Sequence, residues 1–163
     1  MNYTTVFLAI VIIALVTVWW WRNNNSPAAR ANLSETIAQG KAFLEENEDR
    51  PEVVALPSGL QYEVIRSGTG TQPTLQDRVK VHYHGTLIDG TVFDSSVERG
   101  QPATFGVRQV IRGWQEGIPL MNVGSQYRLY IPQELAYGKQ SPSHKIPGGS
   151  TLIFDVELLD VNP

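Results

Sequence analysis

The first feature of the chain is an uninterrupted apolar stretch near its start. Residues 3–21 (YTTVFLAIVIIALVTVWWW) contain no charged side chain. As a helix, these residues would rise about 28 Å, which is close to the roughly 30 Å of a bilayer's hydrocarbon layer. Three consecutive tryptophans, residues 19–21, precede Arg22, an arrangement typical of the headgroup boundary. The pattern therefore predicts a transmembrane anchor over residues 1–22.

Two other interpretations of this stretch are less favoured. A buried core helix would not be apolar on every side and followed at once by three asparagines, residues 23–25. A cleaved signal peptide usually starts with positive charge, whereas residues 1–5 contain no Lys or Arg, and the sole A-x-A-like site, residues 29–31, lies far beyond the apolar stretch. Arg22 and Arg30 follow the anchor, which by the positive-inside rule favours a cytoplasmic location for the rest of the chain.

A polar segment connects the anchor to the remainder of the chain. Residues 23–31 have the composition of a tether, and a short helix is expected over residues 32–47. Asn32 and Glu35 have the spacing of a capping box, and one helix face would carry Leu33, Ile37, Gly40 and Leu44. An acidic run, residues 45–49, and Pro51 would end this helix. We assign residues 23–55 to the tether and helix.

From residue 57 onward, apolar and polar residues alternate in short stretches between glycines and prolines. Strict alternation predicts strands with one buried face, and the clearest stretches are residues 79–84, 126–131 and 152–159, with a further candidate at 60–66. One short helix is expected within residues 112–120, which Gly117 and Pro119 interrupt. The pattern predicts an α+β fold in which a twisted antiparallel sheet wraps around one short helix.

Composition and motifs exclude several kinds of chemistry. The net charge of −3 gives no electrostatic reason to expect nucleic acid binding, and the absence of cysteine excludes disulfides and thiolate catalysis. There is no nucleophile elbow, phosphate-binding loop or zinc-protease motif. His82 and His84 lie on the face opposite Val81 and Tyr83, so we interpret them as exposed histidines rather than metal ligands. We expect no metal and no cofactor.

Five motifs in a fixed order carry a specific resemblance. They are residues 81–85 (VHYHG), 89–96 (DGTVFDSS), 110–114 (VIRGW), 135–138 (LAYG) and 152–158 (LIFDVEL). In sequence and order they resemble the FKBP-type peptidyl-prolyl cis–trans isomerases over about residues 56–161, so residues 56–163 are expected to form the isomerase domain. Residues 40–44 and 56–62 are similar to the lead-in of the bacterial macrophage-infectivity-potentiator branch. The resemblance implies a five-stranded antiparallel half-barrel wrapped on a short helix.

The resemblance also implies a substrate pocket. Trp114 would be its floor, Asp94 its polar group, and Arg99 the basic partner of that aspartate. Apolar and aromatic residues would form the walls: Tyr83, Phe93, Val110, Ile111, Tyr137, Ile146 and Phe154. The Tyr137 hydroxyl and the Ile111 backbone amide would donate to a rotated carbonyl, which makes Asp94, Ile111, Trp114 and Tyr137 the expected catalytic set and the other six residues the substrate-binding set.

Two departures from the family pattern concern the rim of this pocket. Ala103 stands where relatives usually carry an aromatic residue, although Phe105 follows two positions later. Residues 139–145 (KQSPSHK) replace a more apolar, glycine-rich loop. Both departures bear on substrate preference and on affinity for macrolide inhibitors, which are a further candidate class of ligand.

Two functions are compatible with these features. The first is a membrane-tethered prolyl isomerase that acts on unfolded or newly exported proline-containing chains. The alternative is a tethered chaperone or binding module that grips proline-containing segments without turnover. Exported relatives favour a single-pass protein of the bacterial inner membrane with a periplasmic domain, against the cytoplasmic side that the two arginines favour. Because the helical region before the domain is short, a monomer or weak dimer is expected.

Overall fold

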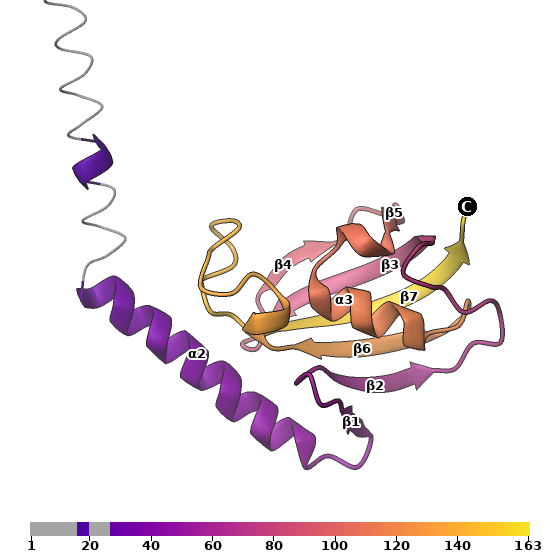
Figure 1. Cartoon of the computed structure of the whole chain (residues 1–163), viewed down its shortest axis with the longest axis horizontal. Helices are drawn as coiled ribbons and strands as arrows, with labels where there is room; N and C mark the ends of the chain where they lie inside the picture. Colours follow the sequence, from indigo (N-terminus) through magenta and orange to yellow (C-terminus); the bar gives the residue numbers. More distant parts are fainter. Residues whose placement is uncertain (1–15, 20–26) are drawn as a thin grey trace, which may run out of the picture. The chain divides into compact units, whose positions relative to one another are not determined.

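The computed structural model describes residues 16–19 and 27–163 and divides the chain into two compact units, Met1–Glu35 and Thr36–Pro163. In the first unit, residues 16–19 are helical and a longer helix, α2 (Pro27–Glu48), begins (Figure 1). No helix among the residues that the structure describes is long and apolar enough to cross a bilayer. Except for residues 16–19, the anchor expected over residues 1–22 lies outside the described residues.

Helix α2 is longer than the sequence pattern indicated. It begins at Pro27 rather than with Asn32 as its cap, so the expected start was wrong and part of the expected tether is helical. Proline is well suited to the first turn of a helix because its φ angle is already helical and its missing N–H has no partner there anyway. The residues that follow, AARA, include strong helix formers. These local preferences start the helix before the capping residue.

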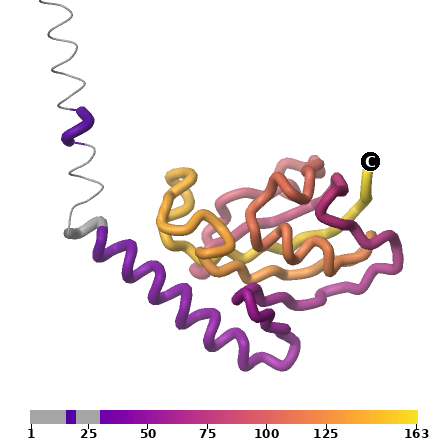
Figure 2. The backbone as a smooth tube through the Cα atoms, viewed as in Figure 1, coloured from indigo at the N-terminus to yellow at the C-terminus, as the bar shows by residue number. Residues whose placement is uncertain are grey.

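A single antiparallel sheet of seven strands forms the second unit. The strands are β1 (Val53–Ala55), β2 (Gln61–Arg66), β3 (Arg78–Leu87), β4 (Val92–Ser95), β5 (Ala103–Gly106), β6 (Gln126–Ile131) and β7 (Leu152–Val161). Their order is β1-β2-β6-β7-β3-β4, and β5 also pairs with β3. Strands β3 and β7 lie side by side although they are far apart in the sequence (Figures 1 and 2).

The sheet therefore has two more strands than the five expected. The strands that alternation did not locate are short: β1 has three residues and pairs with β2 at the edge of the sheet, whereas β4 and β5 have four residues each and both pair with β3. Alternation over three or four residues is too brief to stand out in a sequence. Because β1 is part of the sheet, the tether assigned to residues 23–55 also contributes to the folded unit.

Helix α3 (Arg112–Gly117) packs on one face of this sheet and forms the main core with it (Figure 1). Three short 3₁₀ helices lie in the segments that connect the strands and α3: η1 (Val107–Gln109), η2 (Ile118–Leu120) and η3 (Gln133–Leu135). Gly113 explains how closely α3 approaches β6. A Cβ atom added at Gly113 would lie 2.5 Å from a methyl carbon of Ile131, so only glycine lets the helix, and with it Trp114, lie directly on the sheet.

The opposite face of the sheet is partly covered by the end of α2. Phe43 contacts Tyr130, with ring centroids 6.0 Å apart, and Tyr130 is only 2% exposed. Asn47 donates a 2.8 Å hydrogen bond to Gln61, which in turn donates to the Leu44 carbonyl. In the alternation of residues 126–131, Tyr130 falls on the same side of its strand as Gln126 and Arg128. The helix buries it there.

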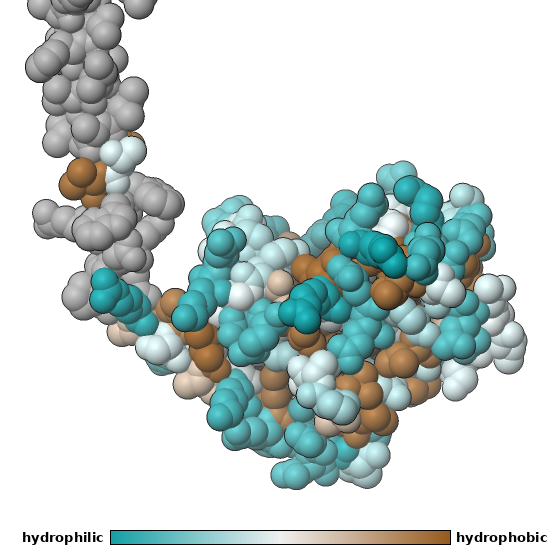
Figure 3. Space-filling model, in the orientation of Figure 1, coloured by the Kyte–Doolittle hydropathy of each residue, from teal (hydrophilic) through white to brown (hydrophobic). Residues whose placement is uncertain are grey.

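Hydrophilic side chains cover most of the domain face seen in Figure 3, with apolar residues in scattered patches among them. The exposed large apolar residues include Val54, Val64, Ile65 and Val97. Isolated exposed apolar residues are common on folded proteins.

Candidate functional site

An aromatic cavity of about 350 Å³ lies between α3 and the face of the sheet that carries the core. It is lined by Tyr83, Phe93, Asp94, Phe105, Gln109, Val110, Ile111, Trp114, Tyr137 and Phe154. These residues come from strands β3, β4, β5 and β7, from helix α3, and from the segments beside η1 and η3. The cavity is thus assembled from elements that are distant in the sequence.

Trp114 forms the centre of the aromatic cluster. It lies on α3, is 4% exposed, and has three aromatic neighbours in edge-to-face arrangements. The ring centroids of Tyr83, Phe105 and Phe154 lie 5.5, 5.8 and 5.2 Å from that of Trp114. Edge-to-face geometry is the preferred contact between aromatic rings, so the cluster is well packed and presents a firm apolar surface.

One polar network borders this apolar surface. The Tyr83 hydroxyl donates a 2.5 Å hydrogen bond to Asp94, and the Arg99 guanidinium donates to both the Asp94 carboxylate and the Tyr83 hydroxyl, the latter at 2.9 Å. The Arg99 guanidinium also lies 5.7 Å from the centroid of the Tyr83 ring. The carboxylate is therefore oriented from two sides.

The network changes the acidity of its members. Burial alone would raise the pKa of Asp94, but hydrogen bonds from Tyr83 and Arg99 and the positive charge of Arg99 outweigh it, so the pKa of Asp94 is lowered. Burial, aided by the hydrogen bond to Asp94, raises the pKa of Tyr83. Asp94 is therefore an anion and Tyr83 a neutral donor at neutral pH, which makes Asp94 a poor proton donor.

Among the described residues that line the cavity, Trp114, Tyr137 and Ile111 each carry a hydrogen-bond donor without a protein partner, and the Trp114 indole N–H is the buried one. In the described part of the chain, neither the Tyr137 hydroxyl nor the Ile111 backbone N–H makes a hydrogen bond. Tyr137 is 41% exposed, and burial of its hydroxyl together with the nearby Asp94 charge raises its pKa. The hydroxyl therefore keeps its proton at neutral pH and can donate a hydrogen bond to a ligand.

Most of the site residues expected from the sequence meet in this cavity. Nine of the ten either line it or, like Arg99, bond to a residue that does. Ile146 does not line it. Its side chain is 7% exposed and belongs to the core cluster, because a turn in which the Ile146 N–H bonds to the Ser143 carbonyl directs it inward. The spacing of the motifs alone carried no information about this turn.

Two lining residues were not in the expected set. Phe105 contacts both Tyr83 and Trp114, whereas Ala103 is half-buried against the core and does not line the cavity. Strand β5 has Phe105 opposite Val79 of β3 in the register of the sheet, so the aromatic residue two positions later occupies the cavity wall. The second unexpected lining residue is Gln109, at the end of η1. In the sequence, the one signal for Phe105 as a lining residue was its position two residues after Ala103.

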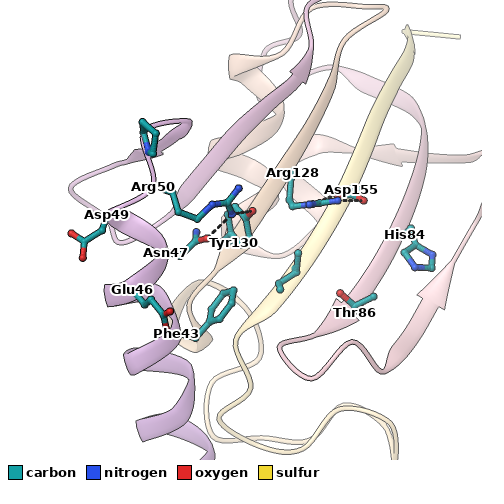
Figure 4. Close-up of a pocket in the computed structure, with 12 residues that line it drawn as sticks. Phe43, Glu46, Asn47, Asp49, Arg50, His84, Thr86, Arg128, Tyr130 and Asp155 are labelled. Carbon is teal, nitrogen blue, oxygen red and sulfur yellow. Dashed lines mark hydrogen bonds and ion pairs between the residues drawn. The ribbon is translucent and has the colours of Figure 1, made fainter.

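A larger hollow of about 850 Å³ lies on the opposite face, between the end of α2 and the sheet (Figure 4). The two arginines that line it already form ion pairs with neighbouring carboxylates. Arg128 forms a bidentate pair with Asp155, at 2.5 and 2.9 Å, and Arg50 donates to Tyr130, Asn47 and two glutamates. Charged groups that satisfy one another leave little for a ligand, so we take the aromatic cavity as the site.

The exposure of His82 and His84, which lie on the same face as this hollow, differs from the expectation. Both are half-buried rather than exposed, since the ring nitrogen of His82 lies 3.0 Å from the Ser96 hydroxyl and that of His84 lies 2.9 Å from the Ser95 hydroxyl. Ser95 is the last residue of β4 and Ser96 follows it, and both lie beside β3. Within residues 16–19 and 27–163, no cluster of three or more His, Asp or Glu side chains is placed to hold a metal ion.

Comparison with known protein families gives two matches. A family model described as FKBP-type peptidyl-prolyl cis-trans isomerase matches residues 69–159. A second, described as the domain amino terminal to FKBP-type peptidyl-prolyl isomerase, matches residues 21–64. The amino-terminal match ends within β2, and the other begins shortly after that strand.

Individual relatives agree with the family matches. The chain is 53% identical to the FKBP-type 22 kDa peptidyl-prolyl cis-trans isomerase of Escherichia coli over 81% of this chain and 64% of that protein. It is 51% identical to the outer membrane protein MIP of Legionella longbeachae over 78% of this chain and 54% of that protein. The crystal structure of FkpA from Escherichia coli matches with a TM-score of 0.79 and 40% identity over 92% of this chain and 72% of that one. The chain thus spans between half and two thirds of these two curated relatives.

Proposed function

Since the chain belongs to the FKBP-type peptidyl-prolyl cis–trans isomerase family, we propose that it rotates X–Pro peptide bonds in the aromatic cavity. One observation carries the proposal: among the described residues that line this apolar cavity, Tyr137 and Ile111 carry donors without a protein partner, and the one acidic residue, Asp94, is held as an anion. Such a site binds and orients a carbonyl. It offers no nucleophile, and the reaction needs none.

The chemistry follows from the nature of the barrier. Rotation of an amide costs about 18–20 kcal/mol because resonance between nitrogen and carbonyl is lost in the twisted state. The planar amide is more dipolar than the twisted one. Transfer from water into the aromatic cavity therefore disfavours the planar form more, and catalysis needs only this difference. A reduction of the barrier by about 6 kcal/mol accelerates rotation by roughly four powers of ten.

Each residue has a distinct role in this proposal. Trp114, Phe154 and Phe105 form the apolar surface for the proline ring, with Tyr83, Phe93, Val110 and Ile146 as walls and supporting core. The Tyr137 hydroxyl and the Ile111 N–H donate to the carbonyl as it rotates. Asp94, oriented by Tyr83 and Arg99, acts through its fixed charge and not by proton transfer.

The direct test is exchange between the cis and trans forms of an X–Pro peptide, measured by NMR in the presence of the chain. We expect acceleration that is lost when Asp94→Ala and Tyr137→Phe are combined. A folded protein that leaves the exchange rate unchanged would instead be a binding module, the second candidate. The exposed, polar loop of residues 139–145 is the observation that favours this candidate, because the family resemblance implies that it lies at the rim of the pocket.

The two candidates are separable in one pair of variants. If the wild type catalyses isomerisation, Asp94→Ala and Tyr137→Phe should each reduce its rate. If the protein works as a chaperone, these variants should still suppress aggregation of an unfolded client as well as the wild type does. Macrolide inhibitors are a candidate ligand of the same cavity, and competition with an X–Pro peptide tests their binding.

We also propose a division of labour along the chain. Residues 56–163 carry the isomerase site, residues 1–22 anchor the protein in a membrane, and residues 23–55 connect the two. The 19 charge-free residues 3–21 support the anchor. Unfolded or newly exported proline-containing chains are then the expected clients, with the domain on the outer side of a bacterial inner membrane.

Topology and assembly each have a simple test. A reporter fused after residue 163 that is active only outside the cytoplasm agrees with the periplasmic assignment, and activity only in the cytoplasm assigns the other side. Loss of membrane association on deletion of residues 1–22 tests the anchor itself. Sedimentation should show a monomer or a weak dimer, and a stable dimer would contradict this expectation.

A further inference from the structure

The wall of the cavity that carries Ile111 is a short segment between η1 and α3. Val110 and Ile111 both have extended backbone conformations, with ψ angles of 175° and 152°. Neither residue belongs to a helix or strand, and neither α3 nor η1 has a side-chain cap. The orientation of the peptide group between Val110 and Ile111 therefore depends on contacts from outside the segment.

The side chain of Gln115 holds the part of the segment before Ile111. Gln115, on the second half of α3, donates from its Nε2 to the Val110 carbonyl at 2.8 Å and to the Arg108 carbonyl at 3.3 Å. An amide nitrogen carries two hydrogens, so it can bond to both carbonyls at once. The backbone N–H groups of Gln115 and Trp114 bond to the Ile111 carbonyl at 3.1 and 3.0 Å. Helix α3 thus anchors the segment before and after Ile111.

The hydrogen bond to Val110 has a consequence for Ile111. The Val110 carbonyl and the Ile111 N–H belong to one peptide group, and the structure has no cis peptide among its described residues. In a trans peptide these two groups point in opposite directions because the unit is planar. When Gln115 holds the carbonyl toward α3, the N–H must point the other way. That N–H is the donor without a protein partner at the cavity.

We propose that Gln115 is a positioning residue for isomerisation: its side-chain amide fixes the peptide group between Val110 and Ile111 so that the Ile111 N–H is presented to the substrate carbonyl. Gln115 does not line the cavity, so it acts through Ile111 and not by touching substrate. This inference rests on the proposed function for its catalytic consequence, whereas the orientation of the peptide group can be measured without any turnover.

The test compares Gln115→Glu with the wild type in the full chain, using NMR exchange of an X–Pro peptide at neutral pH and at about pH 4. The glutamate has the same shape, but its carboxylate cannot donate to a carbonyl. Near its ordinary pKa of about 4.3 it regains a proton and one donor. We expect kcat to fall about five- to ten-fold at neutral pH, with a smaller change in KM, and to recover several-fold relative to wild type at about pH 4.

Two further variants complete the design. Gln115→Met removes the donors without adding a titratable group, so its loss relative to wild type should be the same at both pH values. Gln72→Glu is the matched control: Gln72 also donates its side-chain amide to a backbone carbonyl, that of Pro119 at 2.6 Å, but lies away from the cavity. We expect Gln72→Glu to keep kcat within about two-fold of wild type, because its hydrogen bond supports no group that faces substrate.

The outcomes separate this inference from the proposed function. Equal activity of Gln115→Glu and wild type at neutral pH overturns it, and so does a loss in Gln115→Glu that is the same at both pH values. If the wild type itself does not accelerate exchange, the proposed function fails. The amide resonance of Ile111 then decides: a shift in Gln115→Glu that reverses in acid and is absent in Gln72→Glu supports the positioning role, and an unmoved resonance rejects it.

Discussion

The Tyr83 hydroxyl donates a 2.5 Å hydrogen bond to the Asp94 carboxylate across two neighbouring strands, β3 and β4. In the register of the sheet, Asp94 lies opposite Gly85, two residues after Tyr83. A Cβ atom added at Gly85 would lie 2.6 Å from the Phe93 ring. The glycine therefore leaves room for the aromatic wall beside this hydrogen bond.

The first prediction concerns Asp94 and pH. The lowered pKa of Asp94 means that the folded protein prefers the carboxylate. Its stabilising contribution is therefore present at all pH values above the ordinary aspartate pKa of about 3.9 and is lost as the pH falls through the lower pKa of the folded state. Turnover of the wild type should stay constant down to about pH 4 and then decline. NMR exchange measured from pH 7 to pH 3 checks this.

Asp94→Asn provides the control for this prediction. The amide keeps the shape of the side chain but not its charge, so turnover should be lower at neutral pH and the acidic decline should disappear. An unchanged acidic decline in this variant would show that another group titrates. Arg99→Gln should shift the decline toward higher pH, because the guanidinium that lowers the Asp94 pKa is removed.

The second prediction concerns the hydroxyl of Tyr137. Because this hydroxyl has no protein partner in the described residues, Tyr137→Phe should leave the thermal midpoint unchanged. The lost donor should lower kcat/KM about ten-fold. Tyr62→Phe is a matched control: Tyr62 stacks on Tyr127 away from the cavity, and within the described part of the chain its hydroxyl has no hydrogen bond either. Equal activity of the two variants would argue against donation by Tyr137.

The third prediction distinguishes the two faces of the sheet. Phe105→Ala removes a wall of the cavity and should raise KM about ten-fold, with loss of the edge contact to Trp114. Phe43→Ala removes the ring that covers Tyr130 on the other face and should lower the thermal midpoint while KM stays near the wild-type value. Peptide titrations of both variants, paired with thermal unfolding, measure the two effects. A raised KM in Phe43→Ala would show that packing on the face covered by α2 affects substrate binding in the cavity.

The fourth prediction concerns the attachment of α2. Asn47→Ala should cost about 1–3 kcal/mol of unfolding free energy, because buried Gln61 loses its hydrogen-bond donor. For a chain of this size, each kcal/mol corresponds to about 2–4 °C in the thermal midpoint. Glu48→Ala, at an exposed position on the same helix, should change the midpoint little. Similar midpoints for the two variants would mean that the helix end contributes nothing to stability.

Local patterns in the sequence were enough to locate the long strands and the short helix. Alternation in residues 79–84, 126–131 and 152–159 corresponds to β3, β6 and β7, and residues 60–66 correspond to β2. The inward positions of Tyr83 and Phe154 also follow from alternation, because successive side chains on a strand point to opposite faces. Helix α3 ends at Gly117, one of the two expected interruptions, and the other, Pro119, lies within η2.

Contacts between distant segments decided the remainder. Whether Phe105 or Ala103 lines the cavity depends on how β5 pairs with β3, and the burial of Tyr130 depends on where α2 lies. Ile146 points into the core because of a turn in its loop. Periodicity reports only which face of its own element a residue occupies, whereas the register of a strand, the partner of a face and the direction of a loop are set by long-range packing.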